Sequence, residues 1–332
     1  MKTPVANYLD PHTLSSVASL ELRARLVVEG LMTGMHKSPY FGYSVEFAQH
    51  RQYAPGDDIR HLDWKVFGRS DKLYLKQYQK ETNLDLVVLV DASGSMAFTS
   101  QDGRGLRGGG GTGPWRKYDY AATLAAVLAH LALRQQDRVS VMLFSEELKN
   151  ATRMSNSRGH WQSVAELLAQ AQVEPLESDA SLAGASPREV EARATSLARM
   201  FDQVAARLSQ RSLIVLVSDL FDDAAALERG LARVRHRRHD LFVLQVLDHA
   251  ELTFPYRSPS EFLGLEGEGR LPLDPAALRQ AYLDALHEHL DAVKEITRRF
   301  GFDYLQVDTS EQLGPVLSHF LARRAAMIDK KK

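Results

Sequence analysis

Two acidic residues follow apolar runs that have the length and composition of buried strands. The turn Asp91-Ala92-Ser93-Gly94-Ser95 comes directly after Leu84–Val90, and Asp219 follows Leu213–Val217 with one serine between. Carboxylate and hydroxyl oxygens suit hard cations, and magnesium usually takes one or two protein carboxylates with waters and a ligand oxygen. Ligands of open α/β sheets bind at the carboxyl ends of strands. The pattern therefore predicts a magnesium site formed by Asp91, Ser93, Ser95 and Asp219.

Three other interpretations of this turn remain open. Asp and Ser also favour polar turns that cap a following helix. An aspartate at a strand end can be the nucleophile of a magnesium-dependent phosphoryl-transfer enzyme. Hydrolases of the haloacid dehalogenase type, however, have an Asp as general acid where this chain has Ser93. The last interpretation is a scaffold with a vestigial metal site.

The elements that position this turn alternate along the chain. Short apolar runs alternate with long helical patterns from residue 84 onward, which indicates an α/β fold with strands buried on both faces. Right-handed crossovers favour a doubly wound, mostly parallel, Rossmann-like sheet. The predicted strands are Leu84–Val90, Val139–Phe144, Leu213–Val217, Leu241–Leu247 and Tyr304–Val307. The predicted helices are Tyr118–Gln135, Trp161–Ala171, Ser196–Leu208, Ala224–Arg235, a long helix from Pro275, and Leu313–Met327.

The first 83 residues have a different pattern. A helix is expected over Leu14–Met35, followed by an irregular, strand-containing segment from Tyr40 to Lys80. We therefore predict an N-terminal subdomain of residues 1–83, an α/β domain of residues 84–328 and a tail of residues 329–332. Glycine-rich Gly103–Pro114 and Glu177–Pro187 are predicted surface loops.

Composition excludes several classes of function. The 41 basic and 42 acidic residues give a net charge of −1, so no global field recruits nucleic acid. The basic run Arg233–His239 is expected to end a helix, where cations interact favourably with the helix dipole. The chain has no cysteine, which excludes thiolate chemistry and fits a reducing compartment. No apolar run approaches the ~18 residues of a membrane span, and we predict a cytoplasmic protein without one.

The aspartate–serine turn resembles the metal-ion-dependent adhesion site of von Willebrand factor type A domains. That site has the pattern Asp-x-Ser-x-Ser, a distant Thr and a later Asp, which Asp91, Ser93, Ser95 and Asp219 match. We choose Thr195 for the threonine because it is expected to open the helix leading into the Leu213 strand; Thr152 is the alternative. The resemblance implies a type A-like fold.

A block upstream of the first buried strand resembles the bacterial family called domain of unknown function 58. It runs from Arg51-Gln52-Tyr53 through Asp57-Asp58-Ile59-Arg60 and Leu62-Asp63-Trp64 to Lys72–Tyr78. The resemblance implies a non-enzymatic adaptor that works with a MoxR-type AAA+ ATPase. Two roles remain possible for the charged and aromatic residues of this block: they bind a partner, or they form an internal ion-pair network. The candidate residues are Arg51, Tyr53, Asp57, Asp58, Arg60, Asp63 and Trp64.

Overall fold

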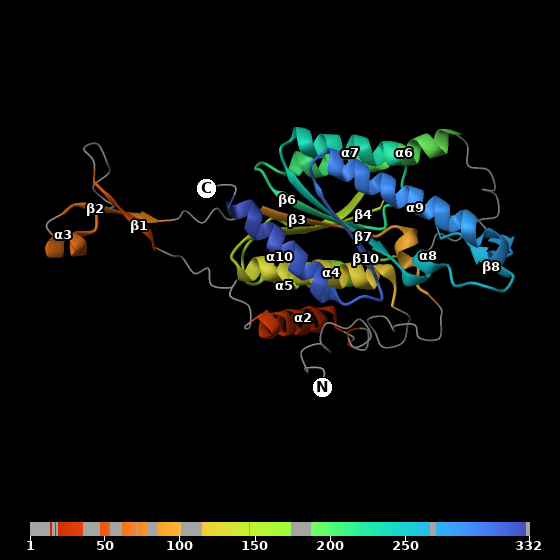
Figure 1. Cartoon of the computed structure of the whole chain (residues 1–332), viewed down its shortest axis with the longest axis horizontal. Helices are drawn as coiled ribbons and strands as arrows, with labels where there is room; N and C mark the ends of the chain where they lie inside the picture. The colour runs from red at the N-terminus through yellow and green to blue at the C-terminus, as the bar shows by residue number, and fades with distance from the viewer. Residues whose placement is uncertain are drawn as a thin grey trace. The chain divides into compact units, whose positions relative to one another are not determined.

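A six-stranded sheet forms the centre of the fold. This computed structural model describes residues 14, 17, 19–35, 47–53, 62–70, 72–78, 85–100, 115–145, 147–173, 187–265 and 270–329. The strands lie in the order β10-β7-β6-β3-β4-β5 (Figure 1). They are β3 (Asp85–Asp91), β4 (Arg138–Phe144), β5 (Leu148–Ala151), β6 (Leu213–Ser218), β7 (Asp240–Leu247) and β10 (Asp303–Asp308). All neighbours are parallel except β5, which is antiparallel to β4. The predicted doubly wound, mostly parallel α/β sheet is confirmed.

The chain reverses its winding direction between β3 and β6. From β3 it moves outward through β4 to β5, and it then crosses to the other side of β3 and continues through β6, β7 and β10. This reversal is a topological switch point, and open α/β sheets bind ligands in the crevice beyond the strand ends there. Asp91 and Asp219 follow the two strands that flank the switch point.

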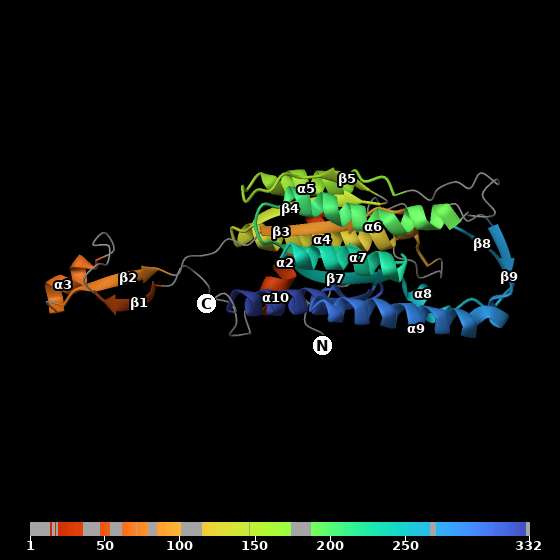
Figure 2. The ribbon, with the colours of Figure 1, turned by 90° about the horizontal axis from the view of Figure 1, so that it is seen from above.

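The sheet is covered on both faces, as its continuous apolar strands require. All residues of β3 and β6 are buried. One face packs against α6 (Pro187–Arg207), α7 (Ala224–His236) and α9 (Pro275–Arg299); α6 and α7 lie above the sheet in Figure 1. The other face is covered by α4 (Lys117–Arg134), α5 (His160–Ala169) and α10 (Leu313–Asp329) (Figure 2). The predicted helices are therefore all present, although α6 begins earlier than expected.

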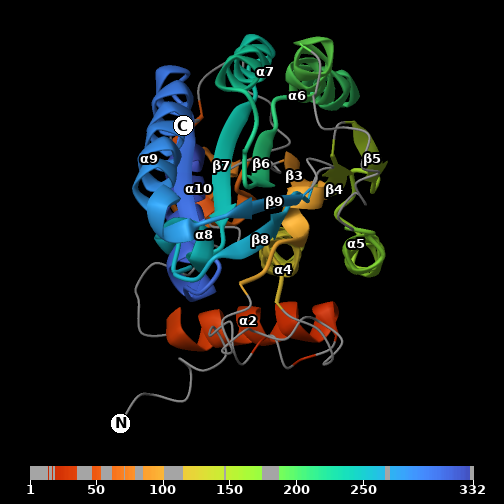
Figure 3. The same ribbon diagram turned by 90° about the vertical axis from the view of Figure 1, so that its right-hand side faces the viewer.

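Helix α4 is buried on nearly all sides because a further helix lies outside it. This outer helix is α2 (Leu20–Met35), which runs beneath α4 in Figure 3. Arg23 of α2 donates from Nη1 to Thr123 Oγ1 at 3.3 Å, and its guanidinium lies 5.2 Å from the centre of the Trp115 ring. Helix α2 thus packs with the α/β layers.

The chain forms two compact units whose boundaries differ from the predicted domains. One unit comprises Met1–Thr33 with Leu84–Lys332, and the other comprises Gly34–Asn83. The predicted subdomain of residues 1–83 is therefore divided, because the apolar side chains of Ala24, Val27 and Leu31 are buried with the α/β unit. Helix α10 ends at Asp329, and the last three residues of the predicted tail lie outside the described residues, as does the predicted loop Gly103–Pro114.

The smaller unit contains a two-stranded antiparallel sheet and a short helix. Strand β1 (Phe47–Gln52) pairs with β2 (Tyr74–Tyr78), and α3 (Trp64–Ser70) lies between them in the chain. Asp63 begins α3: its carboxylate accepts from the Val66 N–H at 3.2 Å, and its carbonyl accepts from the Phe67 N–H at 3.0 Å. The predicted strand content of this region is present.

Four short elements of the α/β unit were not predicted. They are β5, α8 (His249–Thr253), β8 (Ser260–Leu263) and β9 (Arg270–Leu273). Each has only four or five residues, which is too short for a hydrophobic period to be recognised. Helix α8 is stabilised by a capping box between Asp248 and Glu251.

The packing of α6 on α7 leaves no room for a side chain at Gly230. A Cβ there would lie 2.6 Å from Cδ2 of Phe201, whose ring is fully buried. We predict that Gly230→Ala lowers the free energy of unfolding by about 1–3 kcal/mol through overpacking, although alanine favours helix more than glycine does. Urea denaturation measures the change. Gly159→Ala is the control, since nothing lies within 4 Å of its added Cβ, and an equal loss in both variants would contradict the packing argument.

Candidate metal centre

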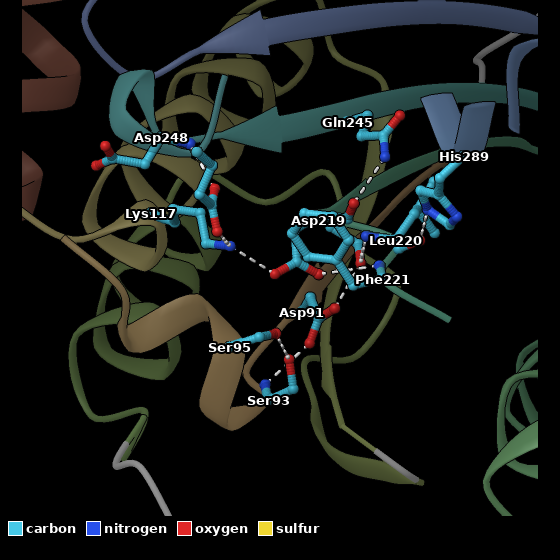
Figure 4. Close-up of polar contacts among 12 residues, drawn as sticks. Asp91, Ser93, Ser95, Lys117, Asp219, Leu220, Phe221, Gln245, Asp248 and His289 are labelled. Carbon is cyan, nitrogen blue, oxygen red and sulfur yellow. Dashed lines mark hydrogen bonds and ion pairs between the residues drawn. The ribbon is translucent and has the colours of Figure 1, made fainter. Parts of the chain in front are cut away.

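The carboxylates of Asp91 and Asp219 lie together at the switch point. Val90 pairs with Val217, so Asp91 and Ser218 come next on the two strands and Asp219 follows. Both acidic residues are buried, with exposed fractions of 5% and 2%. Asp91 Oδ2 accepts from the Ser218 hydroxyl at 2.5 Å, and its Oδ1 accepts from the Ser93 N–H at 2.9 Å (Figure 4). The strand pairing therefore brings two acidic side chains into one buried location.

Among the described ion pairs, none neutralises the buried carboxylate of Asp91. Burial, and after it the negative charge of Asp219, raise the pKa of Asp91 to about 7, although hydrogen bonds from Ser218 and Ser93 oppose the shift. A cation beside Asp91 would favour its ionised form. This electrostatic arrangement suits a bound positive ion.

The hydroxyls of Ser93 and Ser95 lie beside the Asp91 carboxylate. Their Oγ atoms are 3.1 Å apart, and both residues are half-buried: Ser93 precedes the 3-10 helix η3 (Gly94–Ala97), and Ser95 lies within it. Ser93 is the N-cap residue of η3, yet its side chain makes no capping hydrogen bond. The helix-capping interpretation therefore does not account for the Ser93 hydroxyl. Both hydroxyls face the space next to Asp91 (Figure 4).

A lysine that the sequence analysis missed completes the centre. Lys117, the first residue of α4, has no exposed surface, and its Nζ lies 2.7 Å from Asp219 Oδ2 and 2.8 Å from Glu251 Oε1. Burial lowers the pKa of Lys117, but the charges of Asp219 and Glu251 outweigh burial and raise it overall. The lysine therefore remains charged and holds one oxygen of Asp219. A cation at the start of an apolar helix interacts unfavourably with the helix dipole. This conflict is the feature of the sequence that could have marked Lys117 as a residue of the site.

The loop after Asp219 is fixed by side chains from three other elements. Gln245 of β7 donates to the Asp219 carbonyl at 2.8 Å and accepts from the Tyr304 hydroxyl at 2.7 Å. His289 of α9 donates from Nε2 to the carbonyl of Leu220 at 2.8 Å, and Leu220 has a left-handed φ of 54°. No motif or spacing in the sequence distinguishes His289 from the other histidines. These bonds hold Asp219 in place.

The two candidate threonines occupy different parts of the fold. Thr195 does not open its helix: α6 begins at Pro187, so that reason for choosing Thr195 was wrong. Its side chain lies outside the described residues. Thr152 accepts from the Val141 N–H at 2.9 Å. On β4, Asp91 pairs with Phe144, and Val141 lies three residues before Phe144. Three residues of strand span roughly 10 Å. Thr152 is therefore far from the Asp91 turn.

The candidate partner-binding residues are only partly described. Asp57, Asp58 and Arg60 lie outside the described residues, as does the side chain of Arg51. Tyr53 is half-buried, and its N–H donates to the Leu73 carbonyl at 2.9 Å. Asp63 is buried and begins α3, whereas Trp64 is 63% exposed. Trp64 is thus the member of the set with the largest accessible apolar surface that the structure describes.

The donor atoms at the switch point suit magnesium. Within the described ranges, no three His, Asp or Glu side chains gather as a metal site; the centre instead has two carboxylates and two hydroxyls. Hard oxygen donors with few carboxylates are typical of magnesium sites, where waters complete the coordination. Asp219 Oδ1 has only a long contact of 3.5 Å with the Phe221 N–H, so it is the freer oxygen of that carboxylate.

The chain belongs to the bacterial family described as protein of unknown function DUF58. The family model matches residues 49–292, which include most of β1, all of β2, the Asp91 turn and Asp219. This confirms the predicted family resemblance. No helix in the described part of the chain is long and apolar enough to cross a lipid bilayer.

Similar proteins include relatives from Mycobacterium and solved structures of low sequence identity. Uncharacterized proteins of Mycobacterium bovis and Mycobacterium tuberculosis are 23% identical over 321 residues, covering 95% of this chain and 90% of each relative. Among solved structures, the conserved hypothetical protein BatB of Bacteroides thetaiotaomicron has a TM-score of 0.45 at 13% identity, covering 73% of this chain and 99% of that chain. The SpRpn10 type A domain has a TM-score of 0.34 at 12% identity, covering 72% and 95%.

The raised pKa of Asp91 predicts a stability change for Asp91→Asn without metal. Because the folded-state pKa lies above the unfolded value, ionised Asp91 costs stability as pH rises from about 4 to 7, and the full cost is present at pH 8. Asparagine can keep the contacts with Ser93 and Ser218, because its Oδ1 accepts from the Ser93 N–H and its amide N–H can donate to the Ser218 hydroxyl. In EDTA at pH 8 we expect the variant to melt at least about 3 °C above wild type, with a smaller difference at pH 5. A variant that melts lower at both pH values would contradict this account.

Proposed function

We propose that this protein is a non-enzymatic interaction module that uses a bound magnesium ion to capture an acidic residue of a partner protein. The observation that carries the proposal is the pair of buried carboxylates beside two hydroxyls at the switch point. When bound, magnesium would supply positive charge and an open coordination position that a partner Asp or Glu can fill. The residues proposed to hold it are Asp91, Ser93, Ser95, Asp219 and, from the resemblance, Thr195.

The chain's own ligands favour an additional acidic ligand. The two serine hydroxyls are neutral, and Lys117 already neutralises part of the charge of Asp219 through a 2.7 Å ion pair. Asp91 is therefore the one carboxylate of the centre without a lysine partner among the contacts described here. A centre with so little negative charge leaves the ion unsaturated, which supports a role in binding carboxylates.

The position of Asp91 argues against the phosphoryl-transfer alternative. A nucleophilic carboxylate must present an oxygen to its substrate. Asp91 is 5% exposed, and both of its oxygens accept hydrogen bonds, one of them from Ser218 at 2.5 Å. This burial supports a structural or metal-holding role over a nucleophilic one.

The partner class follows from the family resemblance. We propose a MoxR-type AAA+ ATPase as partner, in a chaperone-like or complex-assembly role, without nucleic acid and without a membrane span. The cytoplasm is the proposed compartment, in keeping with the absence of cysteine from the sequence. In the smaller unit, the exposed Trp64 is the proposed aromatic contact.

Magnesium should stabilise the wild-type protein and not the Asp91→Ala variant. A ligand that binds the folded state alone raises stability, so we expect millimolar magnesium to raise the melting temperature of wild type by a few degrees relative to EDTA. The matched control is Asp85→Asn, which removes a buried carboxylate at the other end of β3, where Asp85 pairs with Arg138. Asp85→Asn should keep the magnesium response. An equal response in wild type and Asp91→Ala would show that the ion binds elsewhere.

Capture of a purified MoxR-type ATPase tests the partner. We expect magnesium-dependent capture by wild type, loss of capture with Asp91→Ala, and a reduction of about tenfold with Trp64→Ala, because exposed tryptophans often dominate interface energies. Leu22→Ala, which changes an exposed apolar residue of α2, is the control. Trp64→Ala should leave the magnesium-induced melting shift intact. Unchanged capture by both Asp91→Ala and Trp64→Ala would remove the proposed interface.

A further inference from the structure

Lys117 is placed so that it cannot leave the centre. Its backbone N–H donates to the Phe98 carbonyl at 3.0 Å at the start of α4, and its side chain has no exposed surface. The rings of Phe98 and Phe221 lie 5.8 and 5.1 Å from its ammonium group. A buried ammonium with aromatic rings around it has only the two carboxylates as strong partners. The lysine is therefore a fixed charge of the site.

The lysine also connects the centre to α8. Glu251 accepts from Lys117 with one carboxylate oxygen and from the Asp248 N–H, at 2.8 Å, with the other. The Asp248 carboxylate accepts from the N–H groups of Ala250 and Ser100. Asp219 therefore has Lys117 as its ion-pair partner (Figure 4), and Lys117 shares its charge with Glu251.

We propose that Lys117 is a built-in cation of the metal centre, a positioning residue that keeps one oxygen of Asp219 from a divalent ion and thereby weakens ion binding. The inference rests on the proposed function. Glu251 takes only part of the charge of Lys117, so the ammonium still offsets part of the charge that Asp219 offers to an ion. Without the lysine, Asp219 Oδ2 and Glu251 Oε1 would both lose their ion-pair partner. The lysine thus lowers the affinity of the centre for the ion.

Lys117→Met tests this role, since methionine is unbranched and apolar and can fill the space between the two rings. We expect isothermal titration with magnesium chloride to give a dissociation constant at least about tenfold lower than that of wild type, because a positive charge close to the ion is removed. In EDTA the variant should melt well below wild type, since two buried carboxylates lose their partner. The added Glu251→Gln change should recover part of that loss by removing one orphaned charge.

Glu251→Gln alone tests the same idea in the opposite direction. It retains Lys117 but removes the carboxylate that shares its charge, so the ammonium interacts more fully with Asp219. Magnesium should then bind several-fold more weakly. If Lys117 had a merely structural role, Lys117→Met and Glu251→Gln would change the magnesium affinity in the same direction or not at all. Glu295→Gln is the matched control, because Glu295 forms an exposed pair with Arg298 on α9, and it should bind as wild type does.

The outcomes separate this inference from the proposed function. If wild type does not bind magnesium, the metal proposal fails and the lysine inference fails with it. If wild type binds but Lys117→Met binds no more tightly, the lysine inference alone is overturned. If Lys117→Met does not fold, an unchanged affinity in Glu251→Gln overturns the inference, whereas a weakened affinity beside an unchanged control supports it.

Discussion

The interaction on which the centre depends is the repulsion between two carboxylates buried at the switch point. Parallel pairing of β3 with β6 places Asp91 and Asp219 together, and the helices on both faces keep water away. Buried charges are tolerated only with partners. Asp91 accepts hydrogen bonds from the Ser93 N–H and the Ser218 hydroxyl, and Asp219 forms an ion pair with Lys117. The polar groups around the site are therefore present because two buried carboxylates need hydrogen-bond and ion-pair partners.

The apolar construction of α4 explains why the lysine can act as a fixed charge. The helix lies between the sheet and α2, and the rings of Phe98 and Phe221 lie beside the ammonium of its first residue, which has no exposed surface. Lysines usually extend their ammonium group to solvent. Here the ammonium lies between Asp219 and Glu251, and Glu251 is itself held by the capping box of α8. The core packing of one helix thus determines the electrostatics of the neighbouring centre.

The sheet and the Asp91 turn could be predicted because strands buried on both faces leave continuous apolar runs. Asp219 followed from the same rule applied to β6. Lys117 and Glu251 could not be predicted as a pair, since they lie 134 residues apart and meet only through tertiary packing. The start of α6 was missed because Val190 is the only large apolar residue among its first ten, which are otherwise mostly charged or small. The error in placing Thr195 followed directly from that missed helix start.

The proposed lysine role and the proposed partner binding are linked thermodynamically. If a partner carboxylate completes the coordination of the ion, the ion and the partner increase each other's affinity by the same factor. A lysine that weakens ion binding in the free protein then makes occupancy of the centre depend more strongly on the partner. The ion would be held firmly only in the complex and released with it. Such a centre suits a reversible adaptor, because neither the ion nor the acidic partner needs to bind tightly alone.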